Sequence, residues 1–429
     1  MVLLTGFLKM MGTASVALTV GTTSQTASRG LASSFSSTTI TPAPAAVTAD
    51  PTINAVTATA VAAAITGGPG GEAMRIKSPL IYSFSMSSLE NSPPIYLKLD
   101  VLQPSGSFKD RGMATLCASL QQQGARRLIS SSGGNAGLSA ALCGRILNLP
   151  VRVIVPTTTK PLMLEKIRAQ GAEVEVFGNN WNEADARARW LVEKGGREGG
   201  EDGEGGQAAY IPPYDHPLLW QGHSSLVDEL VESGIEKPAA IVASVGGGGL
   251  LCGIFEGLSR YEKGEDGREG WADVGVVGAE TEGAASFAAG MAAGKVVRLE
   301  GISSLATSLG ALEVTPQALA YALKGGREGG REGGREGGVG SGERVILSEV
   351  VSDKDAVHAC RRFLQDHRLL VEPACGAALA LVYSKRGRER LKALSDAKGG
   401  KPVVVVVCGG SGITPEILAE MERSLGLAA

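Results

Sequence analysis

The stretch Ser105–Gly112, SGSFKDRG, places one lysine, Lys109, in a turn that opens a helix. Beyond the turn, apolar residues recur at helical spacing through Leu120, which predicts an amphipathic helix with Lys109 in its first turn. The positive end of a helix dipole disfavours another positive charge there. Lys109 is therefore a candidate catalytic residue, because a destabilised ammonium form favours the free amine that forms a Schiff base with an aldehyde. Taken alone, the octet also fits a solvated surface lysine.

Four consecutive glycines, Gly246, Gly247, Gly248 and Gly249, follow a predicted strand and precede an apolar helical run. Glycine alone lets successive backbone N–H groups converge on an anion without an obstructing Cβ. At a helix N-terminus such a loop predicts a phosphate-binding site. A tight turn would use the same residues, so the loop gains weight only beside the lysine motif.

Two further strand ends carry polar residues. Ser132, Gly133 and Asn135 lie at a strand-to-helix junction, where side-chain caps and free N–H groups suit a carboxylate. An ordinary helix cap is the alternative. Cys408 ends the apolar run Val403–Val407, and as a purely structural residue it would be a small buried hydrophobe.

These four stretches and two others resemble the fold-type II pyridoxal-phosphate enzymes, and among them the serine/threonine dehydratase family. The likeness runs in order over roughly residues 78–427. The matching stretches are SGSFKDRG at Ser105–Gly112, SSSGGNAG at Ser130–Gly137, YIPPYDHPLLWQGH at Tyr210–His223, SVGGGGLLCG at Ser244–Gly253, LVEPACGAALA at Leu370–Ala380 and VVCGGSG at Val406–Gly412.

The resemblance implies pyridoxal 5′-phosphate as the coenzyme. Lys109 would bind it covalently, Phe108 would pack against it, and Asn135 would meet its ring hydroxyl. The loop Gly246–Gly249 would hold its phosphate. Cys408 would lie beside the pyridine nitrogen, and a neutral partner there suits β-elimination better than transamination. The residues implied for the substrate are Ser132, Gly133, Asn135 and Ala136.

The reaction implied by the resemblance is α,β-elimination, which deaminates L-serine to pyruvate and L-threonine to 2-oxobutanoate with release of ammonia. Lys109 would be the general base for the Cα proton, and the coenzyme phosphate would protonate the leaving hydroxyl. We expect a homodimeric lyase of amino-acid catabolism that supplies gluconeogenesis.

Three alternatives stay open: a serine racemase, a β-replacement synthase of the same fold, and a non-catalytic pyridoxal-phosphate-binding protein. Racemases of this fold carry a serine as second base where this chain has Gly133, so we expect poor racemisation and more room at the substrate. The chain has no regulatory domain after about Leu427, which argues against the large biosynthetic threonine deaminases.

A monovalent cation, potassium rather than sodium, is also implied by the resemblance. The matching positions supply mainly backbone oxygens, and the alternative is that they are ordinary loop residues. These positions are Gly246, Glu280, Ala284, Leu309 and Ala311.

Composition excludes several other classes. The formal net charge is −3, with basic and acidic residues mixed along the chain, so no nucleic-acid surface is expected. Six cysteines without CxxC pairs predict reduced thiols, and four histidines without ligand spacing argue against zinc. No apolar run reaches the length of a membrane span.

Low-complexity segments flank and interrupt the predicted domains. Residues 1–74 are rich in Ala, Ser and Thr, and no acidic residue precedes Asp50. This leader fits an organellar transit peptide or a disordered extension equally well, so the location is cytoplasmic or organellar accordingly. The Gly-rich stretches 195–207 and 325–342, the second with GGRE repeats, predict flexible solvent inserts.

The fold class is α/β with two doubly wound open-sheet domains, similar to the tryptophan synthase β chain. Short β-branched runs alternate with amphipathic helical stretches, which favours parallel sheets covered on both faces. We predict a smaller domain over 102–194 and a larger coenzyme-binding domain over 75–101 and 208–429.

Overall fold

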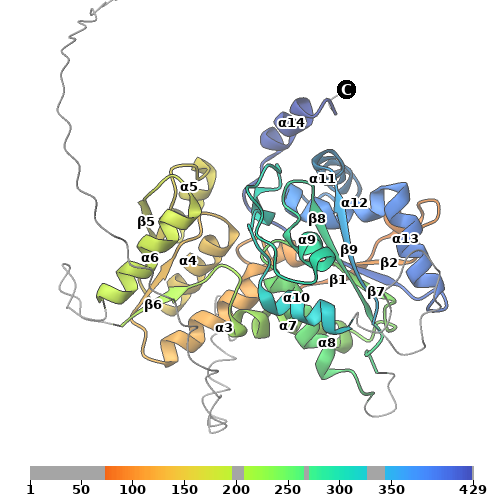
Figure 1. Ribbon diagram of the computed structural model, residues 1–429, viewed down its shortest axis with the longest axis horizontal. Coiled ribbons are helices and arrows are strands. Elements are labelled where there is room, and N and C mark those ends of the chain that lie inside the picture. The colour runs from red at the N-terminus through yellow and green to blue at the C-terminus, as the bar shows by residue number, and fades with distance from the viewer. Residues whose placement is uncertain (1–72, 196–206, 265–269, 326–343, 428–429) are drawn as a thin grey trace, which may run out of the picture. The chain divides into compact units, whose positions relative to one another are not determined.

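The computed structural model describes residues 73–195, 207–264, 270–325 and 344–427, all within one compact unit (Figure 1). The predicted leader and the two Gly-rich inserts lie almost wholly outside these described residues. Met74, the last residue of the predicted leader, is fully buried in an apolar core.

The smaller sheet has four parallel strands in the order β5-β4-β3-β6. Its strands are β3 (Arg127–Ser130), β4 (Val151–Val155), β5 (Glu173–Val176) and β6 (Ala208–Ile211). The helices of this part are α3 (Lys109–Gln122), α4 (Asn135–Leu147), α5 (Pro161–Ala169) and α6 (Trp181–Gly195). Successive side chains of a strand point to opposite faces, so Leu128 packs with α3 and α4 whereas Ile129 packs with α6.

One predicted domain boundary is corrected by this sheet. Strand β6 pairs with β3, with Arg127 opposite Ala208. The prediction that the larger domain resumes at residue 208 is therefore wrong for Ala208–Ile211. The insert before β6 hid this pairing, because the strand is short and separated from its partner by a long connection. The other domain boundaries stay predictions.

The larger sheet has six strands in the order β1-β2-β10-β7-β8-β9, all parallel except β1, which is antiparallel to β2. The strands are β1 (Leu80–Tyr82), β2 (Ile95–Lys98), β7 (Ala240–Ser244), β8 (Gly275–Thr281), β9 (Ile346–Val351) and β10 (Val403–Val406). Every side chain of Val403–Val407 is fully buried, which confirms the prediction of a strand covered on both faces.

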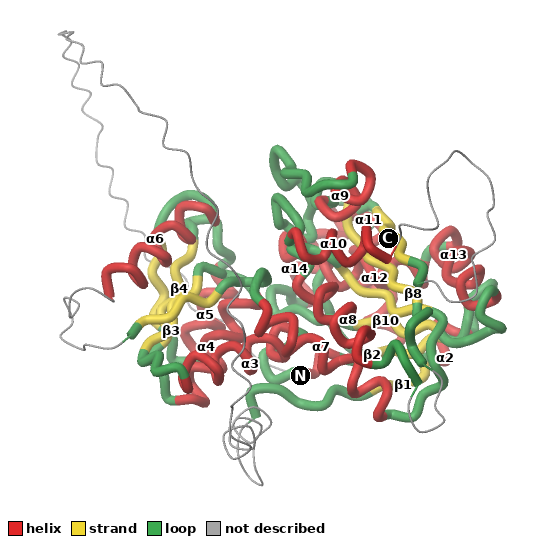
Figure 2. Tube along the Cα trace, turned by 60° about the horizontal axis from the view of Figure 1, so that its bottom comes forward, coloured by secondary structure: helices red, strands yellow, loops and turns green. Residues whose placement is uncertain are grey.

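Helices enclose the larger sheet, with α12 against β7, β8 and β9, and α7 against α8 (Figure 2). These helices are α7 (Pro217–Glu232), α8 (Gly249–Arg260), α9 (Ser286–Ala293), α10 (Pro316–Gly325), α11 (Asp353–His367), α12 (Pro373–Tyr383), α13 (Lys385–Asp396) and α14 (Pro415–Ser424). Three short helices complete the described elements: α2 (Phe84–Ser87), η1 (Asp100–Leu102) and η2 (Thr307–Leu309).

Several helix starts follow from local sequence. Proline opens α5, α7, α12 and α14, where its missing N–H leaves no helical hydrogen bond unmade. The side chains of Ser352, Ser384 and Thr414 accept hydrogen bonds from the first turns of the helices that follow them. Among the described residues, no helix combines the length and apolar character that crossing a membrane requires.

Candidate active site

Lys109 opens α3, as the sequence predicts for the helix start, and its side chain is partly buried. The Nζ atom donates a hydrogen bond to the carbonyl oxygen of Pro213 at 2.8 Å and lies 4.9 Å from the centre of the Phe108 ring. Burial lowers the pKa of Lys109 to about 8. With a pKa of about 8, roughly a tenth of the amine is uncharged at pH 7.

Phe108 precedes the helix and rests on a residue that sequence reasoning missed. The centre of its ring lies 5.0 Å from that of His223 in α7. The imidazole is fully buried, and neither ring nitrogen has a hydrogen-bond partner among the described residues. Burial lowers the pKa of His223 well below its usual value, and the nearby Lys109 and Arg111 lower it further. His223 is therefore a neutral group behind Phe108.

The glycine loop Gly246–Gly249 joins β7 to the N-terminus of α8. Gly248 has a φ of +87°, and a Cβ on Gly247 would lie 2.3 Å from the Tyr214 ring. Both positions therefore require glycine. None of the four N–H groups donates a backbone hydrogen bond within the described residues. They remain available to an anion at the helix N-terminus.

The loop before α4 holds the residues implied for the substrate. Ser132 accepts a hydrogen bond from the N–H of Gly134 at 3.3 Å, and Ala136 is buried in the first turn of α4. The Asn135 side chain does not cap its own helix. Its Oδ1 accepts a hydrogen bond from the N–H of Ser411 at 2.9 Å, which links this loop to the one after β10.

Gly133 is tightly enclosed, contrary to the expectation that it leaves extra room at the substrate. A Cβ built on Gly133 would lie 2.6 Å from Cγ2 of Thr159 and 3.2 Å from Cγ1 of Val155. The Thr159 side chain therefore fills the space that a side chain at position 133 would need. Because the space is filled from within the same domain, a serine at this position would force Thr159 to shift.

Cys408 follows β10 and contacts the lysine motif through the backbone. Its carbonyl oxygen accepts a hydrogen bond from the N–H of Phe108 at 3.0 Å. A hydrogen bond with Cys375 and burial raise the pKa of the Cys408 thiol well above its usual value. The thiol is therefore a neutral group beside Phe108 and Lys109. All six cysteines are buried and free of disulfides.

The implied cation positions are only partly brought together. Gly246 lies against η2, where its Cβ would be 3.1 Å from the Cα of Leu309. The oxygen of Leu309 accepts a hydrogen bond from the N–H of Ala311, and the N–H of Ala284 bonds to Thr281. Glu280 is committed elsewhere: its carboxylate accepts hydrogen bonds from Phe287, Ala288 and Ser348. Burial raises the pKa of Glu280 to about 7.

Glu372 is a second residue that sequence reasoning missed. It directly precedes α12 and is 6% exposed. Its carboxylate accepts hydrogen bonds from Asn135, Ser308 and Gly412. The glutamate stands inside the quoted stretch Leu370–Ala380, but only the folded chain brings it to Asn135.

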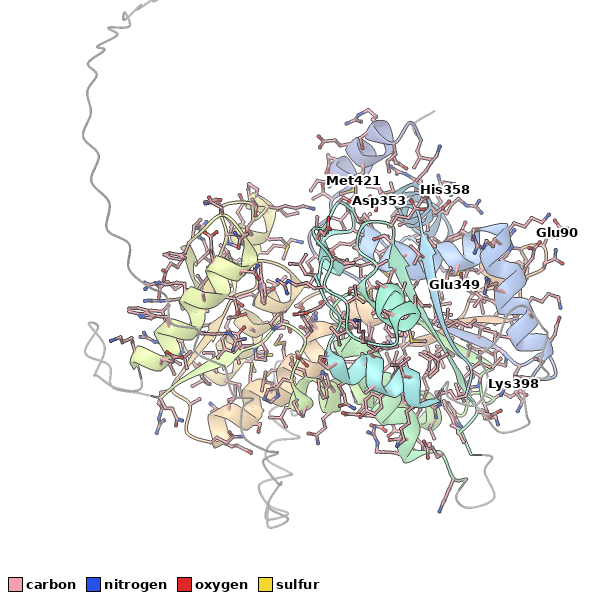
Figure 3. All side chains as sticks on the ribbon, viewed as in Figure 1. Glu90, Glu349, Asp353, His358, Lys398 and Met421 are labelled. Atoms are coloured by element: carbon pink, nitrogen blue, oxygen red, sulfur yellow. The ribbon has the colours of Figure 1, made fainter. Side chains whose placement is uncertain are left out.

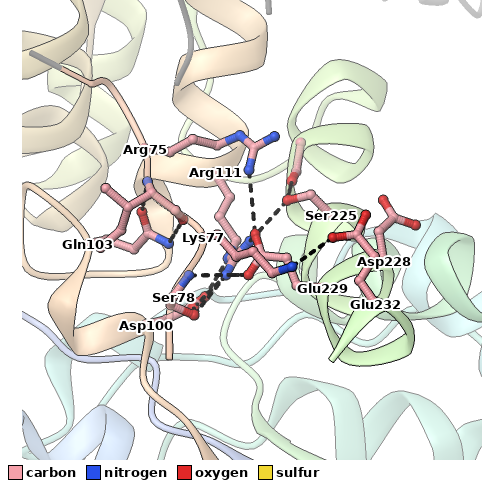
Figure 4. Close-up of polar contacts among 12 residues, drawn as sticks. Arg75, Lys77, Ser78, Asp100, Gln103, Arg111, Ser225, Asp228, Glu229 and Glu232 are labelled. Atoms are coloured by element: carbon pink, nitrogen blue, oxygen red, sulfur yellow. Dashed lines mark hydrogen bonds and ion pairs between the residues drawn. The ribbon is translucent and has the colours of Figure 1, made fainter. Parts of the chain in front are cut away.

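A buried charge cluster lies behind the lysine motif (Figure 4). The Arg111 guanidinium, fully buried, pairs with Asp100 at 2.7 Å and with Glu229 at 2.7 Å. Lys98 pairs with the other oxygen of Glu229 at 2.6 Å, and Ser78 donates to Asp100. Burial acts to lower the pKa of Arg111, but the two carboxylates raise it. This cluster fixes α3 to β2, η1 and α7.

The site fits pyridoxal phosphate by its own chemistry. Lys109 offers a buried amine with a lowered pKa, which suits attack on an aldehyde. The four unbonded N–H groups of Gly246–Gly249 suit a phosphate. The apolar ring of Phe108 and the neutral thiol of Cys408 lie next to Lys109, where an aromatic heterocycle requires an apolar contact and an uncharged neighbour.

Comparison with known proteins identifies the family. Residues 73–409 match the family model described as pyridoxal-phosphate dependent enzyme, and the chain belongs to that family.

Two relatives and one solved structure show how far the similarity extends. The chain is 41% identical over 358 residues to the L-serine dehydratase/L-threonine deaminase of Homo sapiens, covering 83% of this chain and 97% of that protein. It is 38% identical over 365 residues to the L-serine dehydratase of Dictyostelium discoideum, covering 82% and 93%. A fungal L-serine ammonia-lyase from Rhizomucor miehei superposes with a TM-score of 0.68 at 33% identity, covering 82% and 98%. These similarities confirm the predicted fold class.

Proposed function

We propose that this chain is a pyridoxal-phosphate-dependent lyase that deaminates L-serine to pyruvate and L-threonine to 2-oxobutanoate with release of ammonia. The observation that carries the proposal is the partly buried amine of Lys109, which among the described residues donates its hydrogen bond to the neutral carbonyl of Pro213. The names of the relatives support the same reaction and substrates.

Pyridoxal phosphate, when bound, supplies an electron sink for the charge that develops at the substrate Cα. Lys109 accepts the Cα proton, because a pKa of about 8 makes its amine a base near neutral pH. The N–H groups at the start of α4 bind the substrate carboxylate, with Ser132 and Asn135 beside them. Gly246–Gly249 hold the phosphate through their N–H groups.

Cys408 and Phe108 set the environment of the coenzyme ring. The raised pKa of the Cys408 thiol keeps it neutral, so it does not supply the negative charge that would hold a proton on the pyridine nitrogen. Phe108, which packs against the ring of His223, offers an apolar face to the coenzyme ring. These residues favour elimination over transamination.

The same site disfavours a serine racemase. A second base on the opposite face of the substrate is needed to return the Cα proton, and Gly133 has no side chain to provide it. Thr159 fills the space that a Cβ at Gly133 would occupy. We therefore expect L-serine to be converted to pyruvate rather than to D-serine.

Three further proposals rest on the family resemblance. A potassium ion binds at Gly246, Glu280, Ala284, Leu309 and Ala311, and replacing potassium by sodium lowers the elimination rate. The enzyme is a homodimer in solution. It acts in the cytoplasm, or in an organelle if residues 1–74 act as a transit peptide.

The test is an assay of the full chain with pyridoxal phosphate and potassium. Formation of 2-oxo acid is recorded from L-serine and from L-threonine, with D-serine as the stereochemical control. We expect pyruvate and 2-oxobutanoate with an equal amount of ammonia from the L-substrates. A yellow, coenzyme-loaded protein that yields no 2-oxo acid from either L-substrate would contradict the proposal. D-serine formed from L-serine without pyruvate would favour the racemase.

A further inference from the structure

Glu372 precedes α12, but its side chain does not bond to the first turn, unlike those of three polar residues in the same position before other helices. Ser352, Ser384 and Thr414 each bond the first turn of the helix that they precede. The Glu372 carboxylate makes no such bond to α12. It reaches across to three other segments instead, so its role extends beyond capping.

The partners of the carboxylate lie in segments next to the smaller sheet and next to the larger sheet. Asn135 of α4 donates from Nδ2 at 3.1 and 3.3 Å. Ser308 of η2 donates from its hydroxyl at 2.6 Å, and the N–H of Gly412 donates at 2.5 Å. One buried carboxylate therefore joins the start of α4, η2 and the loop that follows Cys408.

These contacts fix which way the Asn135 amide faces. The N–H of Ser411 donates to Oδ1, and Glu372 accepts from Nδ2. A rotated amide would set its oxygen against a carboxylate and its NH2 group against an N–H donor. Nδ2 has two hydrogens, so one remains after the bond to Glu372. Asn135 therefore keeps one N–H donor that it can offer to a ligand.

Neutral hydrogen-bond donors, rather than a cation, stabilise the Glu372 carboxylate. Its partners in the structure are an amide, a hydroxyl and a backbone N–H, and no lysine or arginine of the described chain forms an ion pair with it. The N-terminus of α12 adds a favourable dipole at this position. A carboxylate in this setting holds neutral donors in fixed directions and keeps its hydrogen bonds strong, since one partner is charged.

We propose that Glu372 is a positioning residue for the coenzyme. It orients Asn135 so that the remaining Nδ2 hydrogen points to the ring oxygen of pyridoxal phosphate. The inference rests on the proposed function, because it takes Asn135 as the residue that meets the coenzyme ring. It adds a group that does not itself touch the coenzyme.

The experiment compares the coenzyme affinity of four full-length apoproteins: wild type, Glu372→Gln, Asn135→Ala and the double variant. Pyridoxal phosphate is titrated, and the absorbance spectrum of the bound coenzyme is recorded. Glu349→Gln is the matched control, because Glu349 on β9 is a partly buried carboxylate that pairs with Arg390 at 3.0 Å (Figure 3). Thermal unfolding of each apoprotein reports whether the fold is retained.

We expect Glu372→Gln to bind the coenzyme about tenfold or more weakly with a shifted absorbance maximum, because a charge-assisted hydrogen bond is lost. Glu349→Gln should bind within about twofold of wild type. In the Asn135→Ala background, Glu372→Gln should have no further effect, since Glu372 acts through Asn135. Ser308→Ala keeps the charge and the bond to Asn135, so its affinity should stay within about threefold and provides a second comparison if Glu372→Gln does not fold.

Two results would overturn the inference: a folded Glu372→Gln protein with wild-type affinity and spectrum, or fully additive losses in the double variant. A tenfold loss in Ser308→Ala would overturn it too, because the effect would then not run through Asn135. Failure of the wild type to bind pyridoxal phosphate would overturn the proposed function and this inference together. The wild-type titration therefore separates the two.

Discussion

Lys109 and Arg111 stand two residues apart on α3, yet the chain treats their charges in opposite ways. Arg111 is enclosed by Asp100 and Glu229, which raise its pKa (Figure 4). Among the described residues, Lys109 donates its hydrogen bond to the carbonyl of Pro213, and burial lowers its pKa to about 8. The difference teaches that one helix can present a structural cation and a reactive amine, because the surroundings of the two side chains shift their pKa values in opposite directions.

The largest effect should follow from Lys109→Met, which removes the amine and keeps an unbranched side chain. The rate of 2-oxo acid formation should fall by at least about 10^3-fold, because methionine has no amine to bind the coenzyme or to accept the Cα proton. Steady-state assays with L-serine measure the loss. A variant that retains more than a tenth of wild-type activity would show that Lys109 is only another buried cation.

Arg111→Met is the matched change on the structural side of the comparison. It leaves Asp100 and Glu229 buried and underpaired, so the free energy of unfolding should fall by about 3–5 kcal/mol. Lys109→Met breaks one hydrogen bond to a neutral carbonyl and should change the free energy of unfolding by no more than about 1.5 kcal/mol. Urea unfolding of the two apoproteins measures both values. Equal losses would contradict the distinction between the two cations.

The pH dependence of the Lys109 amine sharpens the comparison. The rate at which the apoprotein captures an aldehyde at Lys109 should rise about tenfold per pH unit below pH 8 and level off above it. An unperturbed lysine would continue to gain reactivity up to about its usual pKa of 10.5. The free energy of unfolding should also rise with pH. The unfolded chain binds this proton more tightly, so the folded apoprotein gains stability as pH rises from about 8 to 10.5.

The smallest effect should come from an exposed ion pair. Lys392 pairs with Asp396 one turn along α13 at 2.6 Å, with both side chains largely in solvent. Lys392→Ala should lower the free energy of unfolding by less than about 0.5 kcal/mol, because solvent screens the pair. A loss comparable to that of Arg111→Met would show that burial does not separate structural charges from surface charges in this chain.

Local signals in the sequence predicted much of the fold. The apolar run Val403–Val407 indicated β10, and the apolar spacing after Lys109 predicted α3. These elements are buried, so their patterns are strong. Strand β1 was missed because it has three residues, two of them exposed, and β6 was assigned to the wrong domain. Neither strand carries a periodicity long enough to recognise.

The site was predictable where a motif is contiguous and not where the fold assembles it. Lys109 and the loop Gly246–Gly249 each occupy one stretch, and the structure places them at helix N-termini as predicted. Glu372 and Asn135 are 237 positions apart, and His223 meets Phe108 only through helix packing. Their contacts depend on side-chain packing in three dimensions, for which a single sequence carries no signal.

The most direct measurement locates the coenzyme on the chain. The full-length protein loaded with pyridoxal phosphate is reduced with borohydride, digested, and analysed by peptide mass spectrometry. The account predicts one phosphopyridoxyl adduct, on Lys109 in the peptide that contains SFKDR. An adduct on a different lysine, or no adduct in a protein that folds, would contradict the claim that Lys109 is the reactive amine of this site.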